Sequence, residues 1–220
     1  MIKLNSTTVA YDSDTVLHNI SLNIKAGEKI ALIGPSGAGK TTLLRKLYET
    51  LLAENNTEAG FIHQDFALIE QLSVFHNVYM GKLDIFSTIK NLRNFLLPSA
   101  AMKSEILPIL ERLGLQEKLF KKAGELSGGQ KQRLAIARCL FKQAQVILAD
   151  EPVASLDIQQ AESVLSTLCQ SAPTVIVSLH STELALRFCN RIIALRDGKI
   201  IFDDTPASLN EQTLSELFKS

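Results

Sequence analysis

The stretch GPSGAGKT, residues 34–41, has the residue types and the spacing that bind the phosphates of a nucleotide. Its glycines leave backbone N–H groups free to turn toward a β-phosphate, and a helix starting there adds its positive end. Lys40 reaches the β- and γ-phosphate oxygens, and Thr41 offers a hydroxyl to Mg²⁺. The predicted phosphate-binding positions are Gly34, Pro35, Ser36, Gly37, Ala38, Gly39, Lys40, Thr41 and Thr42.

Two carboxylates, Asp150 and Glu151, end the apolar segment QVILADE. Charges at the end of a buried strand are costly unless a cation and a water face them. We expect Asp150 to hold Mg²⁺ through water, and Glu151 to orient or deprotonate the water that attacks the γ-phosphate. Together with residues 34–41, which lie between the strand-like IALI and the helical TTLLRKLYETLL, they predict a P-loop NTPase.

The stretch LSGGQKQR, residues 126–133, is a second candidate anion receptor. Ser127 occupies a helix N-cap position, and Gly128 and Gly129 leave amides open before a helix that runs through Gln130. One nucleotide has only one set of phosphates, and residues 34–41 already hold it. We therefore predict that residues 127–130 serve the nucleotide of another copy.

Apolar runs rich in β-branched residues alternate with longer helical patterns, which predicts an α/β fold with a largely parallel sheet. These runs are KIALIG, QVILAD, TVIVSLH and RIIALRDGKIIF. The first segments, IKLNSTTVAY and HNISLNIKAGE, alternate apolar with polar residues and predict an antiparallel β subdomain with one solvent-exposed face. Helical patterns replace the strands between Phe66 and Lys122, in SVFHNVYMGKL, SEILPILERLGL and QEKLFKK. We expect one domain, residues 1–220, with a helical subdomain inserted at approximately 66–140.

The composition limits the partners. Acidic and basic residues balance at 23 each, so we expect no general attraction to nucleic acid and no nucleic-acid partner. No window has the roughly 18–20 apolar residues of a spanning helix, and the N-terminus has no apolar targeting segment, which favours a cytoplasmic chain. Cys139, Cys169 and Cys189 lack metal-ligand spacing and are expected to be buried, reduced side chains.

The set GPSGAGKT, Gln64, LSGGQ, ILADEP, SLD and His180 resembles the ATP-binding subunit of ABC transporters over nearly the whole chain. The resemblance implies a P-loop ABC ATPase fold and a head-to-tail homodimer with two ATP molecules between the subunits. Each ATP is then bound by residues 34–41 of one subunit and by Ser127, Gly128, Gly129 and Gln130 of the other.

Further roles follow from the same resemblance. Tyr11 matches the aromatic residue that stacks on adenine. Asp157 matches the loop that crosses the dimer interface, and His180 matches the histidine that contacts the γ-phosphate. Gln64 matches the glutamine that contacts Mg²⁺ or water and senses the membrane partner. The implied catalytic residues are Glu151, His180 and Gln64, and the implied Mg²⁺ ligands are Thr41, Gln64 and Asp150. The implied partners are membrane permease subunits and, indirectly, a solute-binding protein, with the chain peripheral on the cytoplasmic face of the inner membrane.

Within that family, the segments VASLD and LHSTELALRFC are similar to the corresponding segments of the phosphonate import ATP-binding proteins. Two alternatives stay open: an ABC ATPase of the lipoprotein-release or cell-division type, and a soluble ABC ATPase acting on ribosomes or DNA. The stretch between Lys40 and Gln64 is short for the family, which predicts a trimmed β subdomain. FDDTP replaces the usual turn near Asp203, and SLNEQTLSELF is expected to form a last helix.

Overall fold

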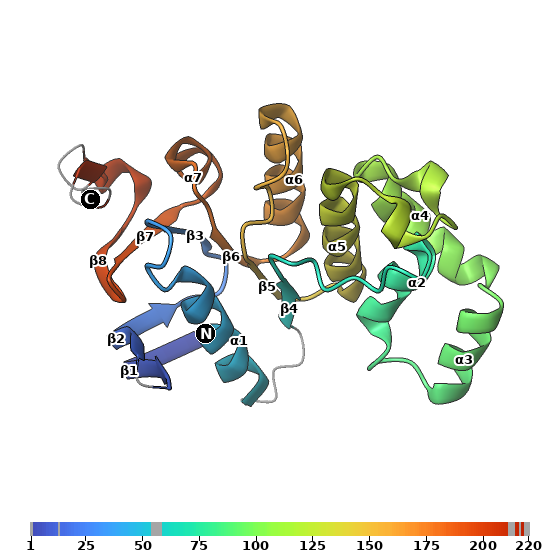
Figure 1. The fold of residues 1–220 in the computed structure, drawn as a ribbon, viewed down its shortest axis with the longest axis horizontal. Coiled ribbons are helices and arrows are strands. Elements are labelled where there is room, and N and C mark those ends of the chain that lie inside the picture. Colours follow the sequence, from blue (N-terminus) through green and yellow to red (C-terminus); the bar gives the residue numbers. More distant parts are fainter. Residues whose placement is uncertain (1, 13, 54–58, 211–213, 216, 218–220) are drawn as a thin grey trace.

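A computed structural model describes residues 2–12, 14–53, 59–210, 214, 215 and 217. Within these ranges the chain forms a two-stranded and a six-stranded sheet with helices around them (Figure 1). The two-stranded sheet pairs β1 (Ile2–Tyr11) with β2 (Asp14–Ile24) in antiparallel register. Apolar and solvent-exposed residues alternate over much of both strands, which confirms the predicted β subdomain with one solvent-exposed face.

The large sheet has the strand order β4-β5-β6-β3-β7-β8, and its first five strands are parallel. They are β4 (Ala59–Ile62), β5 (Val146–Ala149), β6 (Thr174–Ser178), β3 (Lys29–Ile33) and β7 (Arg191–Arg196). Strand neighbours are far apart in the sequence because helices cross between them, as the predicted α/β fold requires.

The two faces of this sheet contribute to two different cores, because successive strand side chains point to opposite faces. Ile30 and Leu32 of β3 pack with the leucines of α1 (Lys40–Ala53) and the apolar side of β1 and β2. Ala31 and Ile33 face a second core, which includes residues of α5 (Gly128–Lys142), α6 (Ile158–Ser171) and α7 (Thr182–Phe188). The structure is therefore layered, with the β1-β2 sheet and α1 on one side.

The run RIIALRDGKIIF differs from the prediction, because it forms two strands rather than one more parallel strand. β7 turns at Asp197 and Gly198, both with positive φ, into β8 (Lys199–Asp204), which pairs with it in antiparallel register. An Asp-Gly pair with positive φ at both positions favours a tight hairpin. β8 ends this edge of the sheet and is followed by η4 (Pro206–Ser208). The predicted last helix falls largely on residues outside the described ranges.

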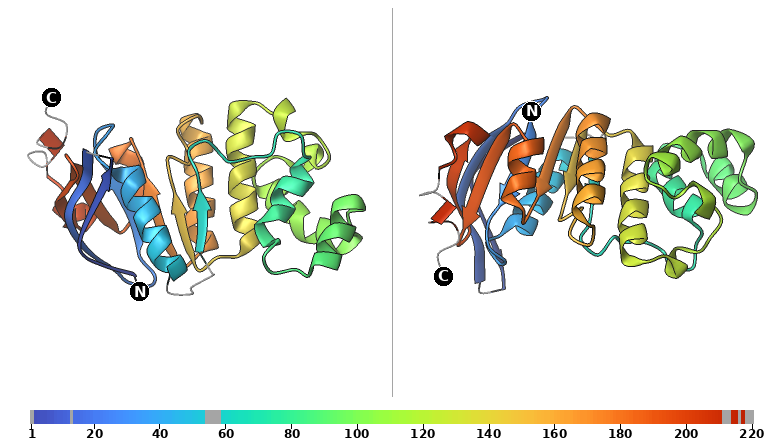
Figure 2. Two further views of the ribbon diagram at one scale, coloured as in Figure 1. Left: turned by 60° about the horizontal axis from the view of Figure 1, so that its bottom comes forward. Right: turned by 90° about the horizontal axis from the view of Figure 1, so that it is seen from above.

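The insertion between β4 and β5 is helical, as predicted. The helices that precede α5 in this insertion lie beyond α5, at one end of the molecule (Figures 1 and 2). The segment QEKLFKK forms only one 3-10 turn instead of the expected helix. The elements before α5 are α2 (Val74–Tyr79), η1 (Met80–Lys82), α3 (Thr88–Leu96), α4 (Ala100–Arg112), η2 (Gln116–Lys118) and η3 (Ala123–Glu125). α1 ends at Ala53 and β4 begins at Ala59, and the predicted trimming of the β subdomain falls largely on residues 54–58, which lie outside the described ranges.

The sequence predicts buried, reduced cysteines, and the structure agrees for two of the three. All three cysteines are free, Cys139 and Cys189 are buried, and Cys169 is half-buried. Burial raises the pKa of Cys139 and of Cys189 to about 12, so both thiols stay protonated at neutral pH. Among the described helices, none combines the length and the apolar character needed to cross a bilayer.

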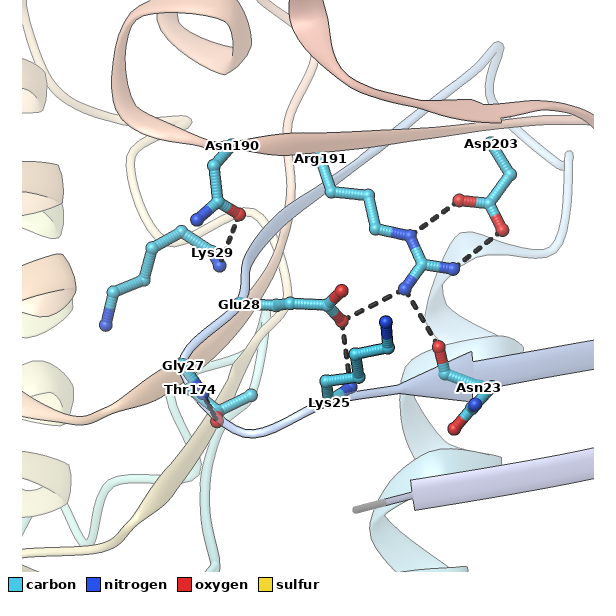
Figure 3. Close-up of polar contacts among 9 residues, drawn as sticks. All are labelled: Asn23, Lys25, Gly27, Glu28, Lys29, Thr174, Asn190, Arg191 and Asp203. Carbon is cyan, nitrogen blue, oxygen red and sulfur yellow. Dashed lines mark hydrogen bonds and ion pairs between the residues drawn. The ribbon is translucent and has the colours of Figure 1, made fainter.

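Arg191 joins the two sheets (Figure 3). Its Nε and Nη2 donate to the two carboxylate oxygens of Asp203 on β8, at 2.7 and 2.8 Å. Its Nη1 donates to Glu28 Oε2 at 3.0 Å and to the Asn23 carbonyl on β2 at 2.8 Å. The hydrogen bonds to Asp203 raise the pKa of Arg191 despite its partial burial. One guanidinium thus holds β2, the loop before β3, and β8 together.

We expect Arg191→Met to lower the free energy of unfolding by roughly 2–4 kcal/mol, because Glu28 and Asp203 would lose their shared cation. Urea denaturation followed by circular dichroism measures this change. The matched control is Arg112→Met at an exposed position of α4, expected to change stability by less than about 0.5 kcal/mol. Equal stability of the two variants would contradict the role of Arg191 as the link between the sheets.

Candidate active site

The candidate residues follow the carboxyl ends of four neighbouring parallel strands. Residues 34–41 follow β3, Gln64 follows β4, Asp150 and Glu151 follow β5, and His180 follows β6. Parallel strands bring their carboxyl ends to one edge, where open α/β sheets bind ligands. The topology therefore places residues from four separate parts of the sequence at one site.

The loop between β3 and α1 is packed too closely for side chains at two of its glycines, Gly34 and Gly39. A Cβ on Gly34 would lie 2.2 Å from the Leu195 carbonyl oxygen, and one on Gly39 would lie 2.7 Å from the Leu17 side chain. Gly39 also has φ +96°, which L side chains rarely adopt. The loop is thus held between β7 and β2, with Gly37 exposed between these two contacts.

Lys40 begins α1 and points back over this loop. Its Nζ donates to the carbonyl oxygens of Gly34, at 2.7 Å, and Pro35, at 2.9 Å. Burial lowers the pKa of Lys40, while the nearby carboxylates of Glu151 and Asp150 act in the opposite direction. A cation held among carbonyl oxygens at the start of a helix is suited to exchange them for phosphate oxygens.

Asp150 is buried, with 2% of its surface exposed. Its Oδ1 accepts a hydrogen bond from Ser178 Oγ on β6 at 2.7 Å, and the same hydroxyl accepts the N–H of Glu151 at 2.8 Å. Ser178 therefore bridges the two acids from the neighbouring strand. A buried carboxylate whose described hydrogen-bond donor is a neutral hydroxyl fits a neighbouring cation, and its hard oxygen suits Mg²⁺.

Glu151 has a left-handed backbone with φ +49°, an uncommon conformation that often occurs at functional sites. Its Oε1 lies 2.6 Å from His180 Nε2, and its Oε2 accepts from Gln64 Nε2 at 3.3 Å. Because a carboxylate can only accept these bonds, His180 carries its proton on Nε2 in this pair. His180 is 51% exposed, so the three side chains meet at a surface open to a ligand.

Residues 127–130 lie away from this group. Ser127 caps α5 by accepting the N–H of Gln130, and the Gln130 side chain accepts the N–H of Ser127, which forms a capping box. α5 packs outside β4, and β4 is three strand spacings from β3, or about 14 Å. The predicted N-cap is confirmed, and the start of α5 is too distant to contact phosphates held by Lys40.

The other predicted residues lie around these two groups. Tyr11 ends β1 with 52% of its surface exposed, on the two-stranded sheet. Asp157 is the N-cap of α6, where its Oδ1 accepts the N–H of Gln160 at 2.9 Å. Thr41 and Thr42 lie half-buried in the first turn of α1. The structure brings together Lys40, Gln64, Asp150, Glu151 and His180, whereas the hydrogen bonds described for Asp157 and for residues 127–130 are to other residues.

Sequence reasoning missed two residues that contact this group, Ser178 and Gln132. Ser178 lies at the end of the run TVIVS, and a hydroxyl at the carboxyl end of a buried strand is a usable signal. Gln132 donates from Nε2 to the Glu151 carbonyl oxygen at 3.1 Å. A single glutamine within a helical pattern carries no such signal.

This geometry defines a P-loop ATPase site at the edge of a parallel sheet, with a second glycine-rich helix start elsewhere. The sequence profile of the family described as "ABC transporter" matches residues 17–154. The phosphonates import ATP-binding protein PhnC of Wolinella succinogenes is 40% identical over 245 aligned positions, which cover 99% of this chain and 88% of that protein. PhnC of Escherichia coli is 35% identical, and the alignment covers 100% of this chain and 95% of that protein. This chain therefore belongs to the ABC transporter ATP-binding family, and it is an ATP-hydrolysing transporter subunit.

Solved structures agree. A dimeric bacterial ABC transporter cassette is 30% identical, with a TM-score of 0.80, over 95% of this chain and 100% of that one. The same cassette in a dimeric post-hydrolysis state, bound to ADP and Pi, has a TM-score of 0.76 and 28% identity. That match covers 95% of this chain and 100% of the other. The predicted ABC ATPase fold is confirmed, and this chain binds ATP. The alignments with the curated relatives span more positions than this chain has residues, so those relatives carry segments that it lacks.

We expect Ser178→Ala to lower kcat for ATP hydrolysis by roughly 10-fold, because the Glu151 N–H and the Asp150 carboxylate both lose a partner. The same change should lower stability by about 1–3 kcal/mol. Steady-state phosphate release and urea unfolding measure the two effects. Ser171→Ala, which removes a hydroxyl bonded to the Thr167 carbonyl in α6, is the control and should leave kcat unchanged. Wild-type turnover in Ser178→Ala would contradict the bridging role.

Proposed function

We propose that this chain powers the import of a phosphonate or a related oxyanion, as a homodimer attached to membrane permease subunits. The observation that carries the proposal is the similarity to phosphonates import ATP-binding proteins, at 35–40% identity over nearly the full chain. The proposed location is the cytoplasmic face of the inner membrane, where the chain is peripheral. A solute-binding protein acts indirectly, through the permease.

The proposed nucleotide site has three parts. Amides of residues 34–39 and the Lys40 ammonium bind the phosphates, and the exposed ring of Tyr11 stacks on the adenine. Thr41, Gln64 and Asp150 hold Mg²⁺, and their oxygen donors and the buried carboxylate of Asp150 fit that ion. When bound, Mg²⁺ supplies positive charge beside the β- and γ-phosphates.

Glu151 is the proposed general base. Its carboxylate is oriented by contacts with His180 and Gln64, and its backbone is left-handed. Glu151 orients the attacking water and takes its proton, while His180 donates from Nε2 to the γ-phosphate once ATP is bound. Apo contacts of this kind rearrange when substrate enters, so the His180–Glu151 pair holds both groups near their working positions.

The dimer follows from the separation of the two receptors. Residues 127–130 are too far from Lys40 to bind the same phosphates, yet their capped helix start presents open amides to an anion. A second copy in head-to-tail arrangement brings them to its partner's γ-phosphate, and Asp157 lies on the loop that crosses the interface. ATP then closes the dimer, and hydrolysis removes the link that holds it closed.

The permease would dock in a groove of about 380 Å³ beside β4. α1, β4, η1 and α5 contribute to its walls, which include Tyr48, Phe61 and Met80 as well as the charged Asp84 and Arg138. His63 lines it too and directly precedes Gln64, so the groove adjoins the loop that holds the Gln64 side chain near Glu151. A short amphipathic helix of the membrane subunit suits such mixed walls.

We expect Glu151→Gln to bind ATP, to lose at least roughly 100-fold in kcat, and to accumulate a dimer in MgATP, because a bound γ-phosphate is no longer cleaved. Size-exclusion chromatography with light scattering measures the dimer, and phosphate release measures the turnover. Adding Ser127→Arg to Glu151→Gln is the control. The double variant should stay monomeric while still binding ATP, because the arginine blocks the second receptor. A dimer in the double variant would contradict the proposed sandwich.

The import role predicts stimulation by solute. We expect the complex purified from mildly solubilised membranes to contain a multi-span permease, and its solute-binding protein loaded with methylphosphonate to raise ATP hydrolysis at least roughly 5-fold. The measurement is phosphate release by the complex in lipid vesicles, with acetate as the control solute. A membrane partner without any binding protein, or equal rates with acetate and methylphosphonate, would contradict phosphonate import.

A further inference from the structure

Gln132 lies in the second turn of α5, two residues after the LSGGQ stretch, and only 1% of its surface is exposed. Its Nε2 donates to the backbone carbonyl oxygen of Glu151 at 3.1 Å. A carbonyl can only accept, so this contact fixes which end of the amide faces Glu151. A buried side chain of the helix that carries residues 127–130 thus holds the residue proposed as the general base.

Glu151 needs support on both sides because of its backbone conformation. With φ +49° it is held by its own peptide groups: Ser178 accepts the N–H, and Gln132 donates to the C=O. The Ala154 N–H makes a longer contact, 3.3 Å, with the same carbonyl. Because the flanking peptides set the direction of the Cα–Cβ bond, Gln132 and Ser178 together aim the carboxylate.

Two further contacts tie the start of α5 to the segment between Glu151 and α6. A Cβ on Gly129 would lie 3.1 Å from Leu156, so helix and loop are in close contact there. Arg133 donates to the Gln160 side chain at the start of α6. Residues 129, 132 and 133 therefore contact three points along residues 151–160.

This junction has unused hydrogen-bonding capacity. Within the described residues, the buried side-chain polar atoms without a partner are Gln132 Oε1 and Arg133 Nε. Buried unpaired groups are unfavourable, so an arrangement that pairs them would be favoured over the present one. Both side chains lie where α5 meets residues 151–160, so a shift of the helix against this segment is the movement that could pair these atoms.

We propose that Gln132 is a positioning residue that couples the two ATP sites of the dimer. When residues 127–130 bind the nucleotide of the partner, the resulting shift of α5 is passed through the Gln132–Glu151 bond to the water-activating carboxylate of the subunit's own site. This inference rests on the proposed function, namely the base role of Glu151 and the shared nucleotide. It adds a named bond by which occupancy of one site sets turnover at the other.

Gln132→Met tests this bond, because methionine has a similar length and no donor. We expect kcat to fall roughly 10-fold while KM and the Kd for ATP stay within about 3-fold, since Gln132 does not touch residues 34–41. We also expect the Hill coefficient for ATP to approach about 1. The control is Leu140→Ala, which weakens packing in the same helix two turns away and should leave kcat per folded molecule and the Hill coefficient unchanged.

Gln132→Glu is the second variant, with nearly the same shape. Its carboxyl can donate to the Glu151 carbonyl only when protonated, so the ratio of its kcat to the wild-type kcat should rise as pH falls from 8 to 6. Loss of packing alone gives a ratio that does not depend on pH. Dividing by the wild-type kcat at each pH removes the effect that titration of the other active-site groups has on both rates.

The outcomes separate the inference from the proposed function. A wild-type kcat and Hill coefficient in Gln132→Met, together with loss of turnover in Glu151→Gln, would overturn the coupling role and leave the proposed function intact. Retained turnover in Glu151→Gln would overturn both. A kcat loss equal to that of Leu140→Ala, or a pH-independent ratio for Gln132→Glu, would assign Gln132 to packing and would also overturn the inference.

Discussion

The structure depends on how closely the phosphate-binding loop approaches the two sheets. Gly34 lies against the Leu195 carbonyl on β7, and Gly39 lies against Leu17 on β2, with no room for a Cβ at either position. Gly198, in the β7-β8 turn, makes a third close contact, with the Val16 carbonyl. The two-stranded sheet, the end of the large sheet and the loop therefore cannot move independently. Arg191 fixes the same two sheets through β2 and β8, so the loop lies within a rigid frame.

The rigid frame matters because several residues of the site next to it are energetically unfavourable. Asp150 is a buried carboxylate, Glu151 has a left-handed backbone, and Lys40 is a buried cation. Each costs free energy alone, and each is tolerated because the neighbouring strand ends supply partners across short distances. Ser178 is central to this compensation, since its one hydroxyl donates to the Asp150 carboxylate and accepts the backbone N–H of Glu151. The site is thus preorganised by its hydrogen bonds before a nucleotide binds.

Much of this could be predicted from the sequence, because each main motif carries its own local signal. Residues 34–41 lie between a strand pattern and a helix pattern, and Ser127 is followed three residues later by the Gln130 of a capping box. The missed features are tertiary. Ser178 and Gln132 reach Glu151 across 27 and 19 residues of sequence. The position of Ser178 at the end of a buried strand places it near the site, but no local pattern indicates its contact with Glu151, and Gln132 has no local signal at all. The β7-β8 hairpin did carry a local signal, because Asp197-Gly198 interrupts the apolar run with a pair that favours a tight turn, and that signal was overlooked. The phosphate loop needed no such information, since its close contacts are met by glycines already in the motif.

In the proposed dimer, the separation of the two glycine-rich helix starts is what would let hydrolysis drive a movement between subunits. If both receptors faced one nucleotide in one chain, cleavage of the γ-phosphate would change only local contacts. They are instead on opposite sides of three strands, so one γ-phosphate can satisfy both only by joining two chains. Its loss then removes an interaction between rigid bodies. In this proposal the chain's own residues would recognise ATP, a second copy and a docking helix, and solute selection would be left to other subunits.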